Sequence, residues 1–174
     1  YGRRPNGIYV PRFRNISEET KRKDYLRGFG FQGGADRGRP TWSNKIGVEL
    51  KEELSEPGNW TMGFMADGEH LPYYENKVTL NRDKTDKYGL PILSIDCEFR
   101  ENEMVMRKDM MNSAAEMLEA AGAKNITTFD NNYNPGFYIT ESGTARMGND
   151  PKTSVLNKWN QMHEVKNVFV TDAS

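Results

Sequence analysis

The closing stretch of the chain, residues 143–174, limits what it can fold into more than any other part. It holds a glycine-bracketed loop (Gly143-Thr-Ala-Arg-Met-Gly148), an Asp-Pro turn that starts at Asp150, and an apolar run that ends in Asp-Ala-Ser174. Glycine allows a backbone to approach a ligand closely, and a strand that ends in small and acidic residues can meet a nucleotide at its carboxyl end. This order of motifs therefore predicts a layout for cofactor contact.

The composition argues against several classes of protein. The 174 residues include 24 basic and 25 acidic side chains, so no strong net charge draws the chain to nucleic acid or to a membrane surface. No apolar run reaches the ~20 residues that a membrane-spanning helix needs. Cys97 is the only cysteine, and His70 and His163 lie far apart, which excludes an internal disulfide and gives no metal-ligand spacing. We predict no metal, no nucleic-acid partner and no membrane-spanning segment, and place both histidines on the surface.

A dinucleotide-binding motif is missing from the sequence. Gly28, Gly30, Gly33 and Gly34 do not have the Gly-x-Gly-x-x-Gly spacing, and no amphipathic helix follows them. We interpret residues 24–41 as a long surface or pocket loop. A complete cofactor enzyme needs the missing motif, so we expect the chain to be a C-terminal fragment of a longer protein.

Hydrophobic periodicity predicts an α+β fold, with an antiparallel sheet and helices packed on one of its faces. Strands are expected at residues 7–13, 59–66, 77–81, 92–99 and 165–171, and helices at 44–54 and 103–121. The strand at 92–99 alternates most cleanly. It is expected to face the second helix through Leu93, Ile95, Cys97 and Phe99. The apolar face of that helix is expected to consist of Met104, Met111, Ala115 and Leu118.

The motif series of residues 143–174 resembles the glucose-methanol-choline (GMC) family of FAD-dependent oxidoreductases. That family reads His-x-x-Gly-Thr-x-x-Met-Gly, then Asp-Pro, Ser-Val and Asn-Leu-Phe-Val-x-Asp-Ala-Ser. The stretch Glu75-Asn-Lys-Val-Thr-Leu80 is similar to the pyranose-oxidising branch of the family, and the opening Gly2-Arg-Arg-Pro-Asn-Gly-Ile-Tyr-Val-Pro11 resembles bacterial members of the same broad group, the sugar dehydrogenases. The resemblance implies a substrate-binding domain at 1–140 and a returning, truncated segment of the FAD-binding domain at 141–174.

The resemblance also implies a chemistry, namely hydride transfer from the CH–OH group of a sugar or other alcohol to FAD. The family's catalytic histidine falls on Thr140, whose hydroxyl can orient a substrate but cannot act as a base at neutral pH. The second catalytic residue, an Asn or His, lies beyond residue 174. The implied cofactor contacts are Gly143, Thr144, Asp172 and Ala173, and the candidate substrate contacts are Gln32 and Tyr138.

Two functions remain open at this stage. The chain is either the substrate side of a sugar or alcohol oxidoreductase, or a non-catalytic sugar-binding or interaction module that kept the fold and lost its histidine at Thr140. FAD is expected in the complete protein, and we expect this chain alone not to bind it. The expected partners are the substrate and the remainder of the FAD domain, and an electron acceptor is a further candidate. The sequence leaves the cytoplasm and the periplasm open as locations.

Overall fold

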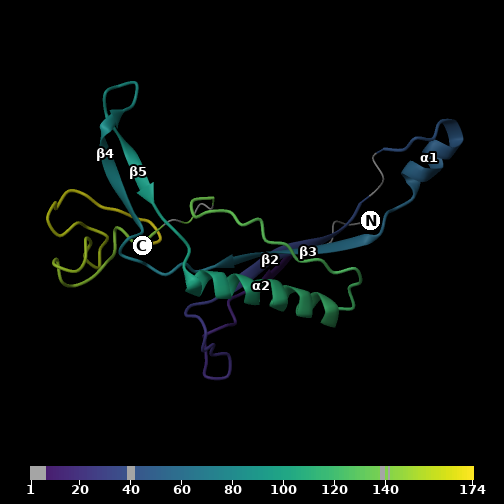
Figure 1. The fold of residues 1–174 in the computed structure, drawn as a ribbon, viewed down its shortest axis with the longest axis horizontal. Coiled ribbons are helices and arrows are strands. Elements are labelled where there is room, and N and C mark those ends of the chain that lie inside the picture. The colour runs from purple at the N-terminus through teal and green to yellow at the C-terminus, as the bar shows by residue number, and fades with distance from the viewer. Residues whose placement is uncertain (1–6, 39–41, 138–139, 141) are drawn as a thin grey trace. The chain divides into compact units, whose positions relative to one another are not determined.

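The computed structural model describes residues 7–38, 42–137, 140 and 142–174. Within them the fold is α+β, as predicted, with two helices and antiparallel strands (Figure 1). The chain divides into two compact units. Unit 1 consists of Tyr1–Leu71 and Phe99–Asn131, and unit 2 of Pro72–Glu98 and Asn132–Ser174. Each is described by itself below. The predicted domain boundary after residue 140 concerns the complete protein and stays a prediction.

Unit 1 is built on a three-stranded antiparallel sheet with the order β1-β2-β3. Its strands are β1 (Gly7–Val10), β2 (Phe29–Arg37) and β3 (Trp60–Gly68). The central strand β2 corrects the prediction of a loop at 24–41. The glycines of β2 have no side chains, so the period-two pattern of a strand is weak there. Gly33 is needed for steric reasons, because a Cβ at this position would lie 2.0 Å from the carbonyl oxygen of Gly63.

The core of unit 1 lies between this sheet and helix α2 (Glu101–Ala120), which contacts β3. Phe29 and Phe31, two residues apart on β2, share the buried face, and their rings meet edge to face with centroids 5.5 Å apart. Tyr25 and Met106 complete the buried cluster. Gly122 follows the end of helix α2 and has a φ of +83°, a left-handed conformation that favours glycine.

The buried face of α2 differs from the predicted one. Met104 is 41% exposed, whereas the buried positions are Glu103, Met106, Asp109 and Ser113. Hydropathy alone assigns the charged positions to solvent, but both carboxylates have partners. Glu103 accepts hydrogen bonds from the backbone N–H groups of Leu71 and Arg100, at 3.1 and 3.0 Å. A satisfied carboxylate can be buried, so the helix presents a different face to the sheet.

Asp109 joins helix α2 to the connection between β1 and β2. Its carboxylate accepts two hydrogen bonds from the guanidinium of Arg14, at 3.0 and 3.2 Å, and one from the Tyr25 hydroxyl at 2.6 Å. Ser113 lies within hydrogen-bonding distance of both Asp109 and Arg14. Burial and the neighbouring carboxylate raise the pKa of Tyr25 well above its ordinary range. We call Arg14, Tyr25, Asp109 and Ser113 the Asp109 cluster.

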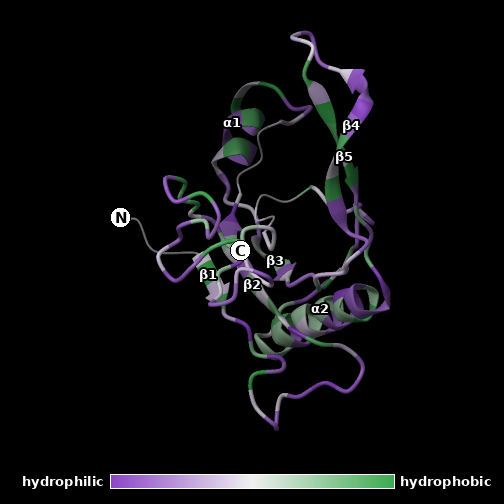
Figure 2. Cartoon of the chain, turned by 90° about the vertical axis from the view of Figure 1, so that its left-hand side faces the viewer, coloured by the Kyte–Doolittle hydropathy of each residue, from purple (hydrophilic) through white to green (hydrophobic). Residues whose placement is uncertain are grey.

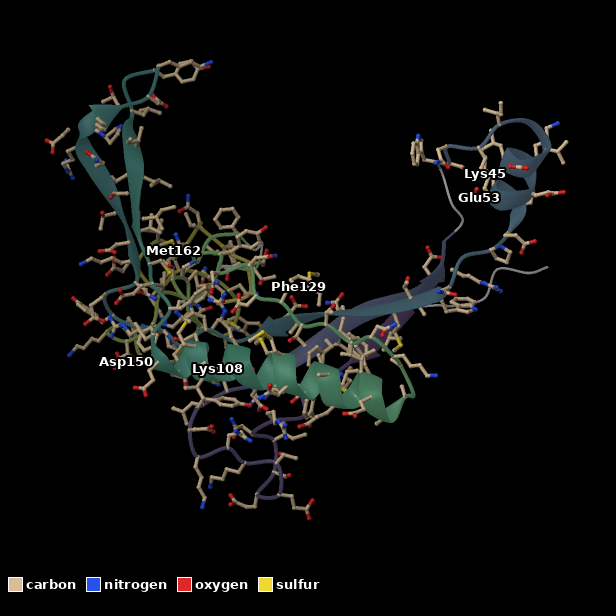
Figure 3. The ribbon with its side chains drawn as sticks, turned by 45° about the vertical axis from the view of Figure 1, so that its right-hand side comes forward. Lys45, Glu53, Lys108, Phe129, Asp150 and Met162 are labelled. Carbon is tan, nitrogen blue, oxygen red and sulfur yellow. The ribbon has the colours of Figure 1, made fainter. Side chains whose placement is uncertain are left out.

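Helix α1 (Gly47–Ser55) confirms the first predicted helix. The N-cap residue is Ile46, which makes no side-chain capping bond. Ser43 donates its hydroxyl to Glu53 at 2.8 Å, and Lys45 lies 3.2 Å from the same carboxylate (Lys45 and Glu53 are labelled in Figure 3). These contacts lower the pKa of Glu53, with the Ser43 hydrogen bond as the largest cause.

In unit 2 the strands β4 (Lys77–Thr85) and β5 (Pro91–Asp96) form an antiparallel hairpin. Hydrophobic and hydrophilic stretches both occur along it (Figure 2). The 92–99 strand and the helix that it is predicted to face belong to different units, so the packing between them stays a prediction. Leu93 and Ile95 are 62% and 71% exposed, and they pair with Leu80 and Val78 on the same hairpin.

The last two residues of that predicted strand lie outside β5. Cys97 is half-buried, and burial raises the pKa of its thiol. Phe99 belongs to unit 1, where the guanidinium of Arg107 on α2 lies 5.5 Å from the centre of its ring. Only Phe99 of the four predicted residues is therefore shown beside the helix. A period-two pattern marks which side chains share a face, but it does not say what covers that face.

In the described part of the chain, neither helix is long and apolar enough to cross a membrane. The same residues contain no group of three or more His, Cys, Asp or Glu side chains arranged to hold a metal ion.

Candidate functional site

The segment 142–174 of unit 2 is shaped by turns and single bridges. The predicted strand at 165–171 is absent, since its described residues form only an isolated bridge between Phe169 and Gln161. The chain turns back instead, so that Met162 donates its backbone N–H to Val168 at 3.0 Å (Met162 is labelled in Figure 3). A turn closed by a bond from the Val168 N–H to the Val165 carbonyl breaks the extended run.

The first and last motifs of this segment meet. The backbone N–H of Gly143 donates to the hydroxyl of Ser174 at 2.8 Å, a contact between residues 31 positions apart. Gly143 has a φ of +105°, a conformation that favours glycine. The carboxylate of Asp172 accepts the backbone N–H of Ser174 at 2.8 Å, which fixes the end of the Asp-Ala-Ser motif.

The four predicted cofactor contacts therefore come from two parts of the chain that this bond joins. Gly143, Thr144, Asp172 and Ala173 are all exposed. Three of them are small or have short side chains, and Asp172 is acidic, so the joined ends leave backbone groups open to a ligand. Thr140 is exposed as well.

A second contact brings the other end of the glycine-bracketed loop against the Asp-Pro turn. A Cβ on Gly148 would lie 2.7 Å from the Cβ and 2.9 Å from the Oγ of Ser154, so only glycine fits at this place. The N–H of Gly148 donates to the carbonyl of Leu156 at 2.8 Å. Leu156 is 2% exposed and is the only buried residue among those described in segment 142–174.

Asp150 organises the turn that carries Ser154 (Asp150 is labelled in Figure 3). Its carboxylate accepts the N–H of Lys152 at 2.9 Å, and its carbonyl accepts the N–H and the hydroxyl of Ser154 at 3.0 and 2.7 Å. Asx turns of this kind explain why aspartate precedes proline here.

His163 joins the loop and the turn. Its Nε2 lies 3.1 Å from the carbonyl oxygen of Gly148 and 3.1 Å from the Oγ of Ser154. Its backbone N–H donates to the carbonyl of Val155 at 3.1 Å. The imidazole is half-buried, which corrects the prediction of a surface residue. No sequence spacing pointed to this role, because the partners of His163 are set by the turns between them. We call Gly148, Asp150, Ser154 and His163 the Gly148 cluster.

Of the predicted substrate contacts, Tyr138 lies outside the described residues. Gln32 is exposed on β2, where it stands in register between Tyr9 on β1 and Met65 on β3. These three side chains line an open hollow of about 720 Å³, together with Phe129 (Figure 3) and with Gly7, Ile8, Gly33, Gly63 and Phe64. Gln32 belongs to unit 1, and the other predicted site residues belong to unit 2.

Comparison with known proteins agrees with these motifs. The family model described as GMC oxidoreductase matches residues 72–174, more than half of the chain. The chain therefore belongs to the GMC oxidoreductase family, and its matched part corresponds to the C-terminal region of that family.

Three curated relatives illustrate the similarity. The chain is 41% identical to 2-methyl-1,2-propanediol dehydrogenase of Mycolicibacterium austroafricanum over 67% of this chain and 21% of that protein. It is 31% identical to the gluconate 2-dehydrogenase flavoprotein of Pantoea cypripedii over 79% of this chain and 23% of that one. It is 28% identical to the fructose dehydrogenase large subunit of Gluconobacter japonicus over 72% of this chain and 22% of that protein.

The chain thus spans about a fifth of the length of the curated relatives that it matches. No solved structure matches it significantly.

Proposed function

We propose that the protein to which this chain belongs is a flavin-dependent oxidoreductase that oxidises the CH–OH group of a sugar or other alcohol. Residues 1–140 form its substrate-binding domain, and residues 141–174 return to the FAD-binding domain. The single observation that supports this most strongly is the bond from the Gly143 N–H to the Ser174 hydroxyl. It brings together the two motifs that the family resemblance assigns to the flavin.

The residues at this junction fit FAD as one edge of a binding site. Gly143, Thr144, Asp172 and Ala173 are exposed and present no bulky side chain to a planar ligand. When bound, FAD supplies the acceptor for a hydride from the substrate carbon. The chain's own part is to position that ligand through backbone groups on either side of the Gly143–Ser174 bond.

FAD has a pyrophosphate, and the strand-turn-helix motif that binds such a group is missing from the sequence of this chain. We therefore expect the chain alone not to retain FAD. Titration of the purified chain with FAD, followed by flavin fluorescence, checks this. Stoichiometric binding at micromolar concentration contradicts it.

Thr140 decides between the oxidoreductase and the alternative, a non-catalytic sugar-binding or interaction module. The family resemblance puts a catalytic histidine at this position, and the threonine hydroxyl can orient a substrate but not remove its proton at neutral pH. The oxidoreductase then takes its base from another residue of the complete protein.

The experiment on Thr140 uses the complete protein and anaerobic flavin reduction. Candidate substrates come from the names of the relatives: 2-methyl-1,2-propanediol, gluconate and fructose. Reduction of the flavin by any of them supports the oxidoreductase. If none reduces the flavin, Thr140→His is expected to raise the rate of flavin reduction by roughly 10²–10⁴-fold over that of the wild type. If the histidine variant binds flavin but still reduces none, the non-catalytic module is the better assignment.

Gln32 is proposed as a substrate contact. It lies in the hollow with Tyr9, Met65 and Phe129, where an amide and aromatic rings can meet the hydroxyl groups and the apolar face of a sugar. Gln32→Ala is expected to raise the KM for the substrate more than it lowers kcat. Because Gln32 is exposed, the variant should fold normally, and an unchanged KM argues against the contact.

A further inference from the structure

We propose that His163 is a positioning residue for the cofactor-contact segment, and that it acts through a single N–H group shared by Gly148 and Ser154. The inference rests on the proposed function for its consequence, but the geometry stands without it. A half-buried imidazole contacts both the glycine-bracketed loop, at Gly148, and the Asp-Pro turn, at Ser154.

The two partners of Nε2 fix which ring nitrogen carries the hydrogen. The Gly148 carbonyl can only accept a hydrogen bond. The Ser154 hydroxyl donates its hydrogen to the Asp150 carbonyl at 2.7 Å, so toward His163 it also accepts. Both partners at 3.1 Å therefore require a donor at Nε2. The geometry assigns a hydrogen to Nε2, shared between the two oxygens.

This shared bond sets the end of the glycine-bracketed loop. The opposite end of that loop, Gly143, meets Ser174 at the predicted flavin edge. Gly148 is held from three sides: by the Nε2 of His163 at its carbonyl, by Leu156 at its N–H, and by the Ser154 side chain against its Cα. Loss of the imidazole donor removes one of these three restraints. The carbonyl oxygen of Gly148 and the Oγ of Ser154 then need hydrogen bonds from water in its place.

Glutamine is the variant that separates positioning from general packing. Its side-chain amide can donate to the same oxygens, whereas leucine fills similar space without a donor. In the complete protein, His163→Leu is expected to weaken flavin retention by about three- to tenfold, as for the loss of one to two hydrogen bonds. His163→Gln should recover most of it. Glu164→Gln, at the exposed neighbouring position, is the matched control and should leave retention unchanged.

A readout independent of flavin keeps the two proposals apart. In the isotopically labelled 174-residue chain, imidazole nitrogen NMR should find Nε2 of His163 protonated. The amide signals of Gly148 and Leu156 should shift in His163→Leu and return toward their original positions in His163→Gln. An Nδ1–H tautomer, or unshifted Gly148 and Leu156 signals, overturns the inference.

The remaining outcomes assign failure to one proposal or the other. If the complete protein binds flavin and His163→Leu retains it as well as the wild type, the positioning role is wrong and the proposed function is untouched. If glutamine behaves as leucine does, the N–H donor is not what matters, and the inference fails. If the complete protein binds no flavin, the proposed function fails, and the tautomer and amide shifts still decide how His163 holds Gly148.

Discussion

In unit 1 the rings of Phe29 and Phe31 are each 1% exposed between a sheet and a helix, whereas Leu156 is the only buried residue described in segment 142–174 of unit 2. Unit 1 is held by apolar burial and by the charged hydrogen bonds of the Asp109 cluster. The unit 2 segment is held by turns, single bridges and the hydrogen bonds of His163.

The difference agrees with the proposed roles of unit 1 as a scaffold and of the unit 2 segment as a contact surface for the cofactor. Burying an aromatic side chain contributes about 1.5–3 kcal/mol, while a neutral hydrogen bond contributes about 0.5–1.5 kcal/mol. A segment that must present exposed backbone to a ligand cannot also cover itself with large side chains. We therefore expect mutations to cost most in the core of unit 1, less in the Gly148 cluster and least on the β4–β5 hairpin.

The largest effect is expected for Phe31→Ala. The ring is 1% exposed and contacts those of Phe13, Phe29 and Phe64, and its removal should lower the free energy of unfolding by about 3–5 kcal/mol. Urea unfolding followed by circular dichroism measures this. Tyr9→Ala on the same sheet, where the ring is 70% exposed, is the control and should change stability by about 0.5 kcal/mol or less. Similar losses in the free energy of unfolding for both variants would contradict the conclusion that apolar burial of Phe31 stabilises unit 1.

Asp109→Asn should have the next largest effect. It weakens the bidentate contact with Arg14 and the bond from Tyr25 in a mostly buried place. A loss of about 1.5–3 kcal/mol is expected for hydrogen bonds to a charged group. The same unfolding experiment measures it. Asp24→Asn is the control, because Asp24 pairs with Arg22 at the surface, where an ion pair adds little. Equal losses for the two variants argue against a buried Asp109 cluster.

Gly148→Ala tests how tightly the unit 2 segment is built. The added methyl group meets Ser154 at 2.7 Å, and overpacking of this kind costs about 1–3 kcal/mol. Hydrogen exchange of peptides from 146–156 should rise, because the loop has to open. The double variant Gly148→Ala/Ser154→Gly should restore only part of the protection, since it removes the atoms that clash but also the hydroxyl that contacts Asp150 and His163. Gly63→Ala is the control, because a Cβ added at Gly63 would have no neighbouring atom within 4 Å. Unchanged hydrogen exchange in Gly148→Ala would mean that the close contact between Gly148 and Ser154 does not stabilise the segment.

The sequence predicted the parts whose signal is local. The helix at 103–121 appeared as α2 because a stretch made mostly of strong helix formers is followed by a glycine with positive φ. The family resemblance assigned Gly143 and Asp172 to the same cofactor, and that assignment stays a prediction. The bond between Gly143 and Ser174 was not predicted from the sequence.

The missed features depend on contacts far apart in the sequence. Strand β2 is rich in glycine, so its period-two pattern is weak, and it is recognised only when its neighbours β1 and β3 are known. The buried face of α2 was missed because Asp109 is satisfied by Arg14, 95 positions away. His163 was missed for the same reason, since its partner Gly148 lies across a turn and 15 positions away.

The smallest effect is expected for Ile95→Ala, and it separates the structure from the sequence-based prediction most directly. A strand that faces a helix would lose about 2–5 kcal/mol on this change. Ile95 is instead 71% exposed and pairs across the hairpin with Val78, so the loss should be that of one cross-strand pair, about 0.2–1 kcal/mol. Val78→Ala should cost about the same. The double variant should cost less than the sum of the two, because the second change has no pair left to break. Urea unfolding of the three variants measures this. A loss above about 2 kcal/mol for Ile95→Ala would mean that the side chain is covered after all, and the contrast between the core of unit 1 and the hairpin of unit 2 would not hold.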